Sequence, residues 1–257
     1  MATMMLAPRF PLFRKEAKYE FLRLLRARTF TLATIGFPLM FYLLFGVVNS
    51  HSGQGAQSIS KYLLATYAIF GLVGSSLFGI SVTLANERTL GWLEVKQASP
   101  MPAPAYLVAK LLTAFAFALI IFSLLLTIGL TLGHVVISAG EIRHLLFTIL
   151  GGVLPFASMG LMLAMVVPPQ AAPGIINLIY LPMSFCSGLW MPISSLPHWL
   201  QTIAPIWPTY HLSQIALGGI GFGMLGTLGG HVAALAGFTV AMLLMAAMLF
   251  RRNASKG

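Results

Sequence analysis

A charged stretch divides this hydrophobic chain; it reads NERTLGWLEVK over residues 86–96 and is followed by SPMP over residues 99–102. Apart from single ions at segment edges, it is the only charged island between the first long apolar segments and the C-terminal tail. Charged side chains are costly in hydrocarbon, so a polar stretch between two membrane spans faces water. The sequence therefore predicts that residues 86–102 can contact a soluble partner.

Composition places the chain in a membrane. The 257 residues are 58% hydrophobic and only 8% charged, whereas soluble domains carry about 25% charged residues. The formal charge is +10, and the acidic residues are all Glu. The basic residues cluster beside apolar segments, which is typical of membrane orientation signals and does not indicate a nucleic-acid-binding face. The single cysteine, Cys186, excludes an intrachain disulfide.

Six apolar segments have lengths close to the roughly 17–25 residues needed to cross the hydrocarbon core. They predict an all-α membrane protein with one domain over residues 1–257 and transmembrane helices at residues 30–48, 62–84, 106–132, 145–167, 175–191 and 228–250. Before them, residues 11–28 carry apolar side chains on one helical face and basic side chains elsewhere. This pattern predicts an amphipathic helix at the membrane surface; the alternative is a plain positively charged flank of the first span.

The Lys and Arg residues are distributed unequally between the two sides of the predicted membrane. All of the 15 except Lys61 and Arg143 fall on one side, which holds both termini and residues 86–105. Because cytoplasmic loops are enriched in Lys and Arg, this side is expected to be cytoplasmic.

The histidines fall on the predicted outer side, at His51, His134, His144, His198, His211 and His231. No two of them have the close spacing typical of metal ligands, so polar residues in wet loops are the favoured interpretation. Small residues recur every fourth position at Gly71, Ser75 and Gly79. This stripe permits close approach of another helix, either from the same chain or from a second copy. Asn177 is the costliest polar residue in the apolar segments and is expected to face the interior, as helix glue or as a cavity wall.

Several mechanisms lack their usual residues in this sequence. No charged residue lies in the middle of a predicted span, which argues against an ion-driven antiporter and a charged-ring channel. The G-K-[ST] phosphate loop and the H-E-x-x-H metal motif are absent, and Ser187-Gly188 lacks the first glycine of a serine-nucleophile motif. The chain is therefore expected to have no catalytic residues, metal or bound cofactor, so uphill transport would need energy from another polypeptide.

Two motif regions lie on opposite predicted sides. The inner one reads E-R-x-x-G-x-L-E over residues 87–94 and continues with Ser99-Pro100. The outer one reads S-G-x-x-x-P over residues 187–192 and L-P-x-W-L over residues 196–200. Together with six spans and inner termini, they resemble the membrane subunit of ABC-2-type ABC transporters, a family of export permeases. The resemblance covers nearly the whole chain.

The resemblance implies a homodimer or related heterodimer of permeases that binds two separate ATPase subunits, which carry ATP and Mg²⁺. It implies a coupling helix at residues 86–102 that docks on the ATPase, with the amphipathic helix beside it. Coupling is assigned to Glu87, Arg88, Gly91, Leu93 and Glu94, and Trp92 with Leu93 is the kind of apolar anchor that carries interface energy. Short re-entrant outer helices at residues 192–227 would close the pathway, and the outer gate is assigned to Pro192, Pro197, Trp199, Pro208 and Tyr210.

Departures from the family pattern leave the substrate open. Thr89 stands where an acidic residue is frequent, Trp92 replaces a smaller residue, and His211 follows Tyr210 without the usual acidic and Arg residues. We expect a multi-pass permease of a bacterial inner membrane that exports a small amphiphile, such as a drug, antibiotic or lipid-like molecule. The alternatives are a polysaccharide or glycolipid exporter, an ATP-independent carrier or channel, and a membrane scaffold or sensor partner of an ATPase. An intramembrane enzyme is the least favoured.

Overall fold

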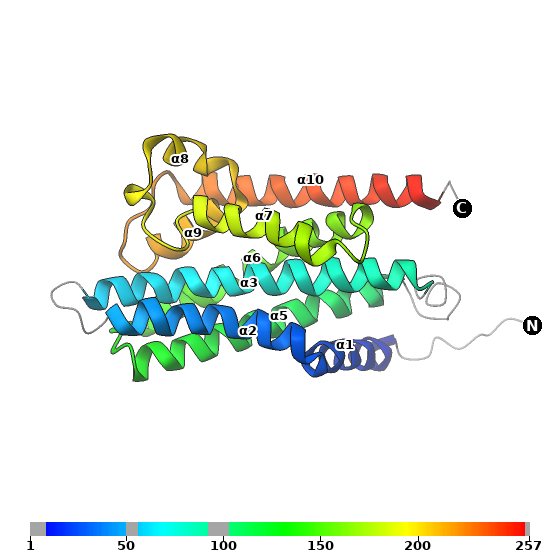
Figure 1. Ribbon diagram of the computed structural model, residues 1–257, viewed down its shortest axis with the longest axis horizontal. Helices are drawn as coiled ribbons and strands as arrows, with labels where there is room; N and C mark the ends of the chain where they lie inside the picture. The colour runs from blue at the N-terminus through cyan, green and yellow to red at the C-terminus, as the bar shows by residue number, and fades with distance from the viewer. Residues whose placement is uncertain (1–8, 50–55, 92–102, 255–257) are drawn as a thin grey trace, which may run out of the picture.

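The computed structural model describes residues 9–49, 56–91 and 103–254. Within these ranges the secondary structure is helical (Figure 1). The longer helices and the π-helical segment η1 are α1 (Arg9–Arg26), α2 (Arg28–Phe41), η1 (Tyr42–Val47), α3 (Ala56–Thr89), α5 (Ala103–Thr131), α6 (Ala139–Val166), α7 (Ala172–Cys186) and α10 (Leu228–Ala254). Between α7 and α10 lie four short elements, η2 (Ile193–Ser195), α8 (His198–Ile203), η3 (Ala204–Ile206) and α9 (Pro208–Gly218).

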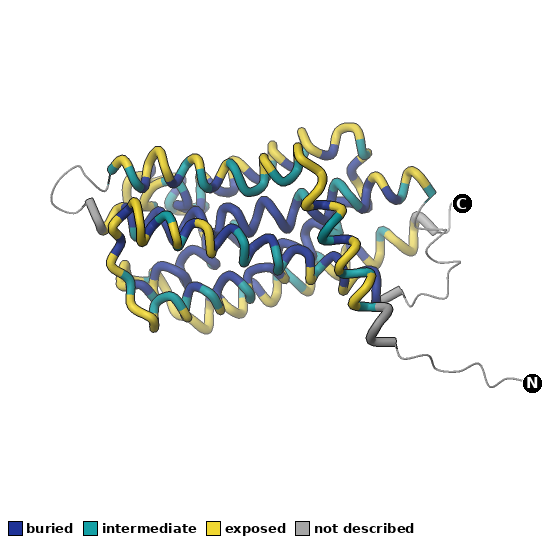
Figure 2. The backbone as a smooth tube through the Cα atoms, turned by 90° about the horizontal axis from the view of Figure 1, so that it is seen from below, coloured by how far each residue is buried: buried dark blue, intermediate teal, exposed yellow. Residues whose placement is uncertain are grey.

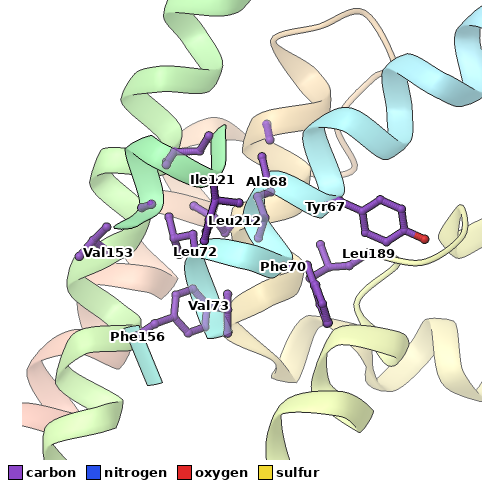
Figure 3. Close-up of a cluster of buried hydrophobic side chains, with 14 of the residues drawn as sticks. Tyr67, Ala68, Phe70, Leu72, Val73, Ile121, Val153, Phe156, Leu189 and Leu212 are labelled. Carbon is purple, nitrogen blue, oxygen red and sulfur yellow. The ribbon is translucent and has the colours of Figure 1, made fainter. Parts of the chain in front are cut away.

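Helix α3 is the centre of the bundle. It packs against α2, α5, α6, α7 and α9, and Figure 2 shows the buried backbone running through the middle of the molecule. Its apolar residues continue around the whole helix, as expected for a helix surrounded by others. Figure 3 shows Phe70, Leu72 and Val73 of α3 among Ile121 of α5 and Phe156 of α6. The core is therefore built around α3.

Among the described residues, five helices are long and apolar enough to cross a membrane: Arg28–Val47, Ser58–Thr89, Ala105–Thr131, Ala139–Val166 and Leu228–Arg252. The expected span at residues 175–191 is not confirmed. There the chain forms α7, which has 15 residues and is about 22 Å long, less than the roughly 30 Å hydrocarbon core. Helix α7 ends at Cys186 because Gly188, two residues later, has a φ of 76°, a non-helical conformation that glycine adopts readily at the end of a helix.

The two ends of the bundle differ in construction. Helix α1, the C-terminal end of α3 and the C-terminal end of α10 lie toward one end (Figure 1). Helices α8 and α9 and the start of α10 lie toward the opposite end. We call these the inner and the outer end, following the charge distribution. Short helices lie between α7 and α10 at the outer end as expected, and their re-entrant character stays a prediction.

Helix α1 begins two residues before the expected amphipathic segment and packs against α5. Its apolar face is used for this contact: Leu24 is buried, and the Phe21 ring lies 5.6 Å from the Phe117 ring. Ala27 separates α1 from α2, and Figure 1 shows the change of direction there. The positively charged N-terminal segment is therefore a helix attached to the bundle and not only a flank of the first span.

The small-residue stripe on α3 packs within the same chain. A Cβ atom at Gly71 would lie 2.5 Å from Ile121 Cγ2 and 3.1 Å from Pro38 Cγ, whereas Ser75 is buried and Gly79 faces Phe30 and Leu24. Of the two possibilities for its partner, the structure thus places helices of the same chain against the stripe.

Replacing Gly71 by alanine is therefore expected to destabilise the bundle by about 1–3 kcal/mol, because the new methyl group overpacks the contact with Ile121. The matched control is Gly151→Ala in α6, where a Cβ atom meets nothing within 4 Å. That control is expected to be neutral or stabilising, since alanine favours a helix more than glycine does. Thermal unfolding of the two variants in detergent measures the difference, and equal stability would contradict the packing argument.

Candidate functional site

A group of charged and polar side chains joins three helices at the inner end of the bundle. It consists of Glu20 and Arg23 on α1, Glu87 on α3, and Tyr106 and Lys110 on α5. We call this group the inner ionic cluster. Each helix contributes at least one member, so the cluster fixes α1 and α5 against the C-terminal end of α3.

Lys110 lies at the centre of the inner ionic cluster. Its side chain is 2% exposed, and its ammonium nitrogen lies 2.8 Å from a Glu20 carboxylate oxygen and 3.4 Å from Glu87. It also donates a hydrogen bond of 2.9 Å to the Thr83 hydroxyl. The three N–H donors of the ammonium group therefore have acceptors, as a buried charge requires.

Arg23 and Tyr106 complete the cluster. The Arg23 guanidinium lies 2.8 Å from Glu20 and 2.5 Å from Glu87, and the Tyr106 hydroxyl donates a hydrogen bond to Glu87. Burial acts to lower the pKa of Arg23, but the Glu20 and Glu87 carboxylates raise it, and the net pKa lies above its ordinary value. Two carboxylates thus face two cations, and the cluster is electrically balanced.

A second contact at the inner end joins α3 to α6. The Arg88 guanidinium donates hydrogen bonds to the backbone carbonyls of Met165 and Val167, where α6 ends. A cation at a helix C-terminus is favourable because the last carbonyls lack partners in the helix. Gly91 follows with a φ of 70°, a conformation that glycine adopts without strain and that ends α3. Four helices are therefore tied together near residue 90.

The positions of the predicted coupling residues change one expectation. Glu87 and Arg88 were expected to contact a soluble partner, but both bond to residues of the same chain, and the Glu87 side chain is 7% exposed. They can transmit a movement of the adjacent residues to α1, α5 and α6. Trp92, Leu93 and Glu94 lie outside the described residues, and their coupling role stays a prediction.

At the outer end, a proline lies at or just before the start of three short helices. Pro192 precedes η2, Pro197 precedes α8, and Pro208 is the first residue of α9, positions that proline favours because they need no N–H donor. Trp199 on α8 is 64% exposed, whereas Tyr210 on α9 is buried. The residues assigned to the outer gate thus belong to one segment but do not form one compact cluster, and their gate role stays a prediction.

Hydrogen bonds attach residues 187–227, which we call the outer segment, to the bundle. The Tyr62 hydroxyl of α3 donates to the Gly188 carbonyl, and Ser187 and Thr209 both donate to the Met183 carbonyl near the end of α7. Gln214 on α9 accepts from the backbone N–H of Leu225. At these points the irregular backbone is partnered by side chains of the protein, as buried backbone polar groups generally are.

Asn177 does not face the interior of the chain, contrary to the sequence expectation. It lies on the exposed face of α7 next to Leu178, which is 75% exposed. In the single chain α7 packs against α3, α8 and α9, and the role of Asn177 as helix glue or cavity wall stays a prediction. Its polar amide is consequently available to a second copy or to a pathway.

The inner ionic cluster and one histidine contact could not be read from the sequence patterns described above. Lys110 was counted only as a charge at the edge of a span, and Glu20 was not singled out. An isolated charge several residues inside an apolar helix needs a partner, and that signal could have identified Lys110. His211 and His231 contact each other although twenty residues separate them in the sequence, so spacing rules for metal motifs could not have found the pair.

Comparisons with known proteins agree with this architecture. The family model described as ABC-2 type transporter matches residues 12–221, which include the inner ionic cluster and most of the outer segment. The chain therefore belongs to the ABC-2 type transporter family. Members of this family are transport permeases, the membrane subunits that associate with an ABC ATPase. The chain is also similar to the provisionally named transport permease YvfS of Bacillus subtilis (strain 168), with 26% identity over 200 residues, 78% of this chain and 82% of the relative. This chain is a multi-pass membrane protein, and its described residues form no strands.

Replacing Lys110 by methionine is expected to destabilise the chain by about 3–5 kcal/mol, because two buried carboxylates then share only Arg23. The second substitution Glu20→Gln in the Lys110→Met background should recover part of this loss. The control is Lys61→Met, which removes a single, more exposed pair with Glu141 and should cost about 0–1 kcal/mol. Thermal unfolding in detergent distinguishes these values, and similar losses at Lys110 and Lys61 would show that the cluster does not stabilise the inner end.

Proposed function

We propose that this chain is the membrane subunit of an ATP-driven exporter in a bacterial inner membrane, and that it moves a small amphiphilic compound outward. ATP and Mg²⁺ bind to a separate ABC ATPase subunit, since the sequence has no phosphate loop. The membership of the chain in the ABC-2 family supports the class of function. Two copies, or this chain with a related one, form the transport pathway.

The inner ionic cluster carries the proposal for how ATP hydrolysis reaches the bundle. Glu87 lies five residues before Trp92, where the undescribed stretch begins, and it bonds to α1 and α5. Arg88 bonds to α6 beside it. A force applied to residues 92–102 by the ATPase therefore acts on four helices together, and it changes the equilibrium between two arrangements of the bundle.

The exposed face of α7 supports a pathway between two copies. Asn177, Leu178 and Leu181 lie on this face, which combines one polar amide with apolar side chains. Such a surface suits an amphiphilic molecule, because apolar contacts supply affinity and a few polar groups fix orientation. The outer segment of residues 187–227 is short and lies against the bundle, which favours a small amphiphile over a polymer.

The proposal is tested by reconstituting the chain with its partner ATPase in vesicles that contain an amphiphilic fluorescent dye. Dye movement that requires both ATP and the ATPase is the expected result. Movement with this chain alone would instead identify an ATP-independent carrier or channel. ATPase binding without movement of any amphiphile in a panel of dyes would identify a scaffold or sensor partner.

Docking of the ATPase is expected to depend on Leu93 and Glu94. Leu93→Ala should weaken binding by about 2 kcal/mol, roughly 30-fold, if Leu93 is a buried anchor of the interface. Glu94→Ala should also weaken binding, and the affinity of this variant should depend less on salt than that of the wild type, because a charge that salt can screen is lost. Affinity measurement with the detergent-solubilised chain and the purified ATPase tests both variants.

The control for docking is Trp199→Ala, which removes a large exposed apolar side chain at the opposite end of the molecule. Its affinity for the ATPase should equal that of the wild type. Unchanged binding by both Leu93→Ala and Glu94→Ala would exclude residues 92–102 as the docking segment.

A further inference from the structure

Two histidines at the outer end form a direct contact that the proposed transport mechanism does not use. His211 lies on α9 and His231 lies in the first turns of α10, and their Nδ1 atoms are 2.8 Å apart. The ring planes are tilted by 55° with centroids 5.1 Å apart. The contact joins the outer segment to the last long helix.

The hydrogen bonds around the two rings determine how many protons they hold. Nε2 of His211 lies 2.9 Å from the Pro205 carbonyl, and Nε2 of His231 lies 2.7 Å from the Leu225 carbonyl. A carbonyl oxygen only accepts, so both Nε2 atoms carry a proton. The Nδ1–Nδ1 contact then needs one further proton, donated by one ring to the lone pair of the other. Three protons on four nitrogens give the pair one positive charge.

We propose that the His211–His231 pair is a proton-dependent contact between α9 and α10. One shared proton holds the two helices together, and a second proton separates them. With two imidazolium rings, both Nδ1 atoms are donors and two positive charges face each other at hydrogen-bond distance, so the contact becomes repulsive.

The surroundings favour a single charge in this pair. Tyr210 contacts both rings, with centroids 5.5 Å from His211 and 5.9 Å from His231, and it supplies no carboxylate to offset a second charge. His144 on α6 bonds instead to the Ile215 carbonyl of α9, and Glu141 on α6 pairs with Lys61 on α3. Burial lowers the pKa of His211 first, and the positive charge of His231 lowers it further, against the opposing effect of the Pro205 carbonyl.

The sign of the pH dependence follows from this lowered pKa of His211. When the helices separate, the pKa of His211 returns toward its ordinary value near 6.5, so the separated state binds the second proton more tightly. Above about pH 6.5 the second proton is absent from both the joined and the separated state and does not oppose the contact; as the pH falls from there toward the lowered pKa of His211, the second proton favours separation and the contact is lost. Each pH unit in this window favours separation by up to about tenfold.

The distance distinguishes a proton from a metal ion. Two imidazole nitrogens bound to one tetrahedral zinc ion at about 2.0–2.1 Å would lie about 3.3 Å apart, which exceeds the separation in the pair. No group of three His, Cys, Asp or Glu side chains suited to a metal ion is found among the described residues. A hydrogen bond therefore fits the geometry better than a coordinated metal.

The contact itself does not depend on the proposed function; only its location at the outside of the cell rests on that proposal. Given that orientation, acidity outside the cell would release α9, which carries Pro208 and Tyr210 of the predicted outer gate. The pair would then adjust the mobility of the outer segment to the external pH.

The test is amide hydrogen exchange of residues 205–218 in the full chain in lipid nanodiscs from pH 8 to pH 5, corrected for the intrinsic exchange rate at each pH. The wild type should lose protection by up to about tenfold per pH unit below pH 6.5. His211→Asn and His231→Asn should each remove this loss, because an amide can still bond to the remaining imidazole but two positive charges can no longer meet.

Two further variants serve as controls. His198→Asn changes an exposed histidine of the same outer segment, and His144→Asn changes a histidine that contacts α9 from α6; both should keep the acid-dependent loss. The proposal is overturned if the loss persists in His211→Asn and His231→Asn, or if it disappears only in His144→Asn. It is also overturned if a chelator at pH 7.5 causes the same loss of protection, since a metal ion would then occupy the pair. This experiment needs no ATPase, so its failure is independent of a failure of the transport proposal.

Discussion

The ammonium group of Lys110 between two carboxylates is the interaction on which the inner end of this protein depends. The Lys110 side chain is only 2% exposed, and a buried charge is stable only with close partners of opposite sign. Those partners come from α1 and α3, so the charge of one residue on α5 requires that two other helices lie beside it. The apolar contacts of α1 and α3 with α5, including the Phe21–Phe117 pair, satisfy the same arrangement.

The outer end is organised differently, through hydrogen bonds to backbone carbonyls. Proline and glycine interrupt the helices there, and the resulting free carbonyls accept from Tyr62, Thr209 and His211. Such contacts are weaker individually than a buried ion pair and depend on geometry that small movements disturb. An inner end with fixed charges and an outer end with breakable contacts suit a protein that receives force at one end and changes shape at the other.

Much of the fold could be predicted from the sequence because hydrocarbon constrains it strongly. Long apolar segments, an N-terminal amphipathic helix and short helices after Cys186 are present as predicted. The fifth span is not confirmed, because hydropathy counts apolar residues and does not show that the helix ends at Cys186, just before Gly188. The exposure of Asn177 in the single chain could not be predicted for a related reason: the number of neighbours around α7 depends on packing between helices, which periodicity alone does not specify.

The sequence by itself determined the class of protein, since its composition and two motif regions indicated a membrane helix bundle of the ABC-2 type transporter family. Only the tertiary structure decided which charged residues meet. Glu20, Glu87 and Lys110 are far apart in the chain. Nothing in their spacing indicates that three helices bring a carboxylate oxygen of each Glu within 3.4 Å of the Lys110 ammonium nitrogen. The same holds for His211 and His231. The physical reason is that ion pairs and hydrogen bonds depend on distances of a few ångströms between helices, and these distances result from the packing of the whole bundle.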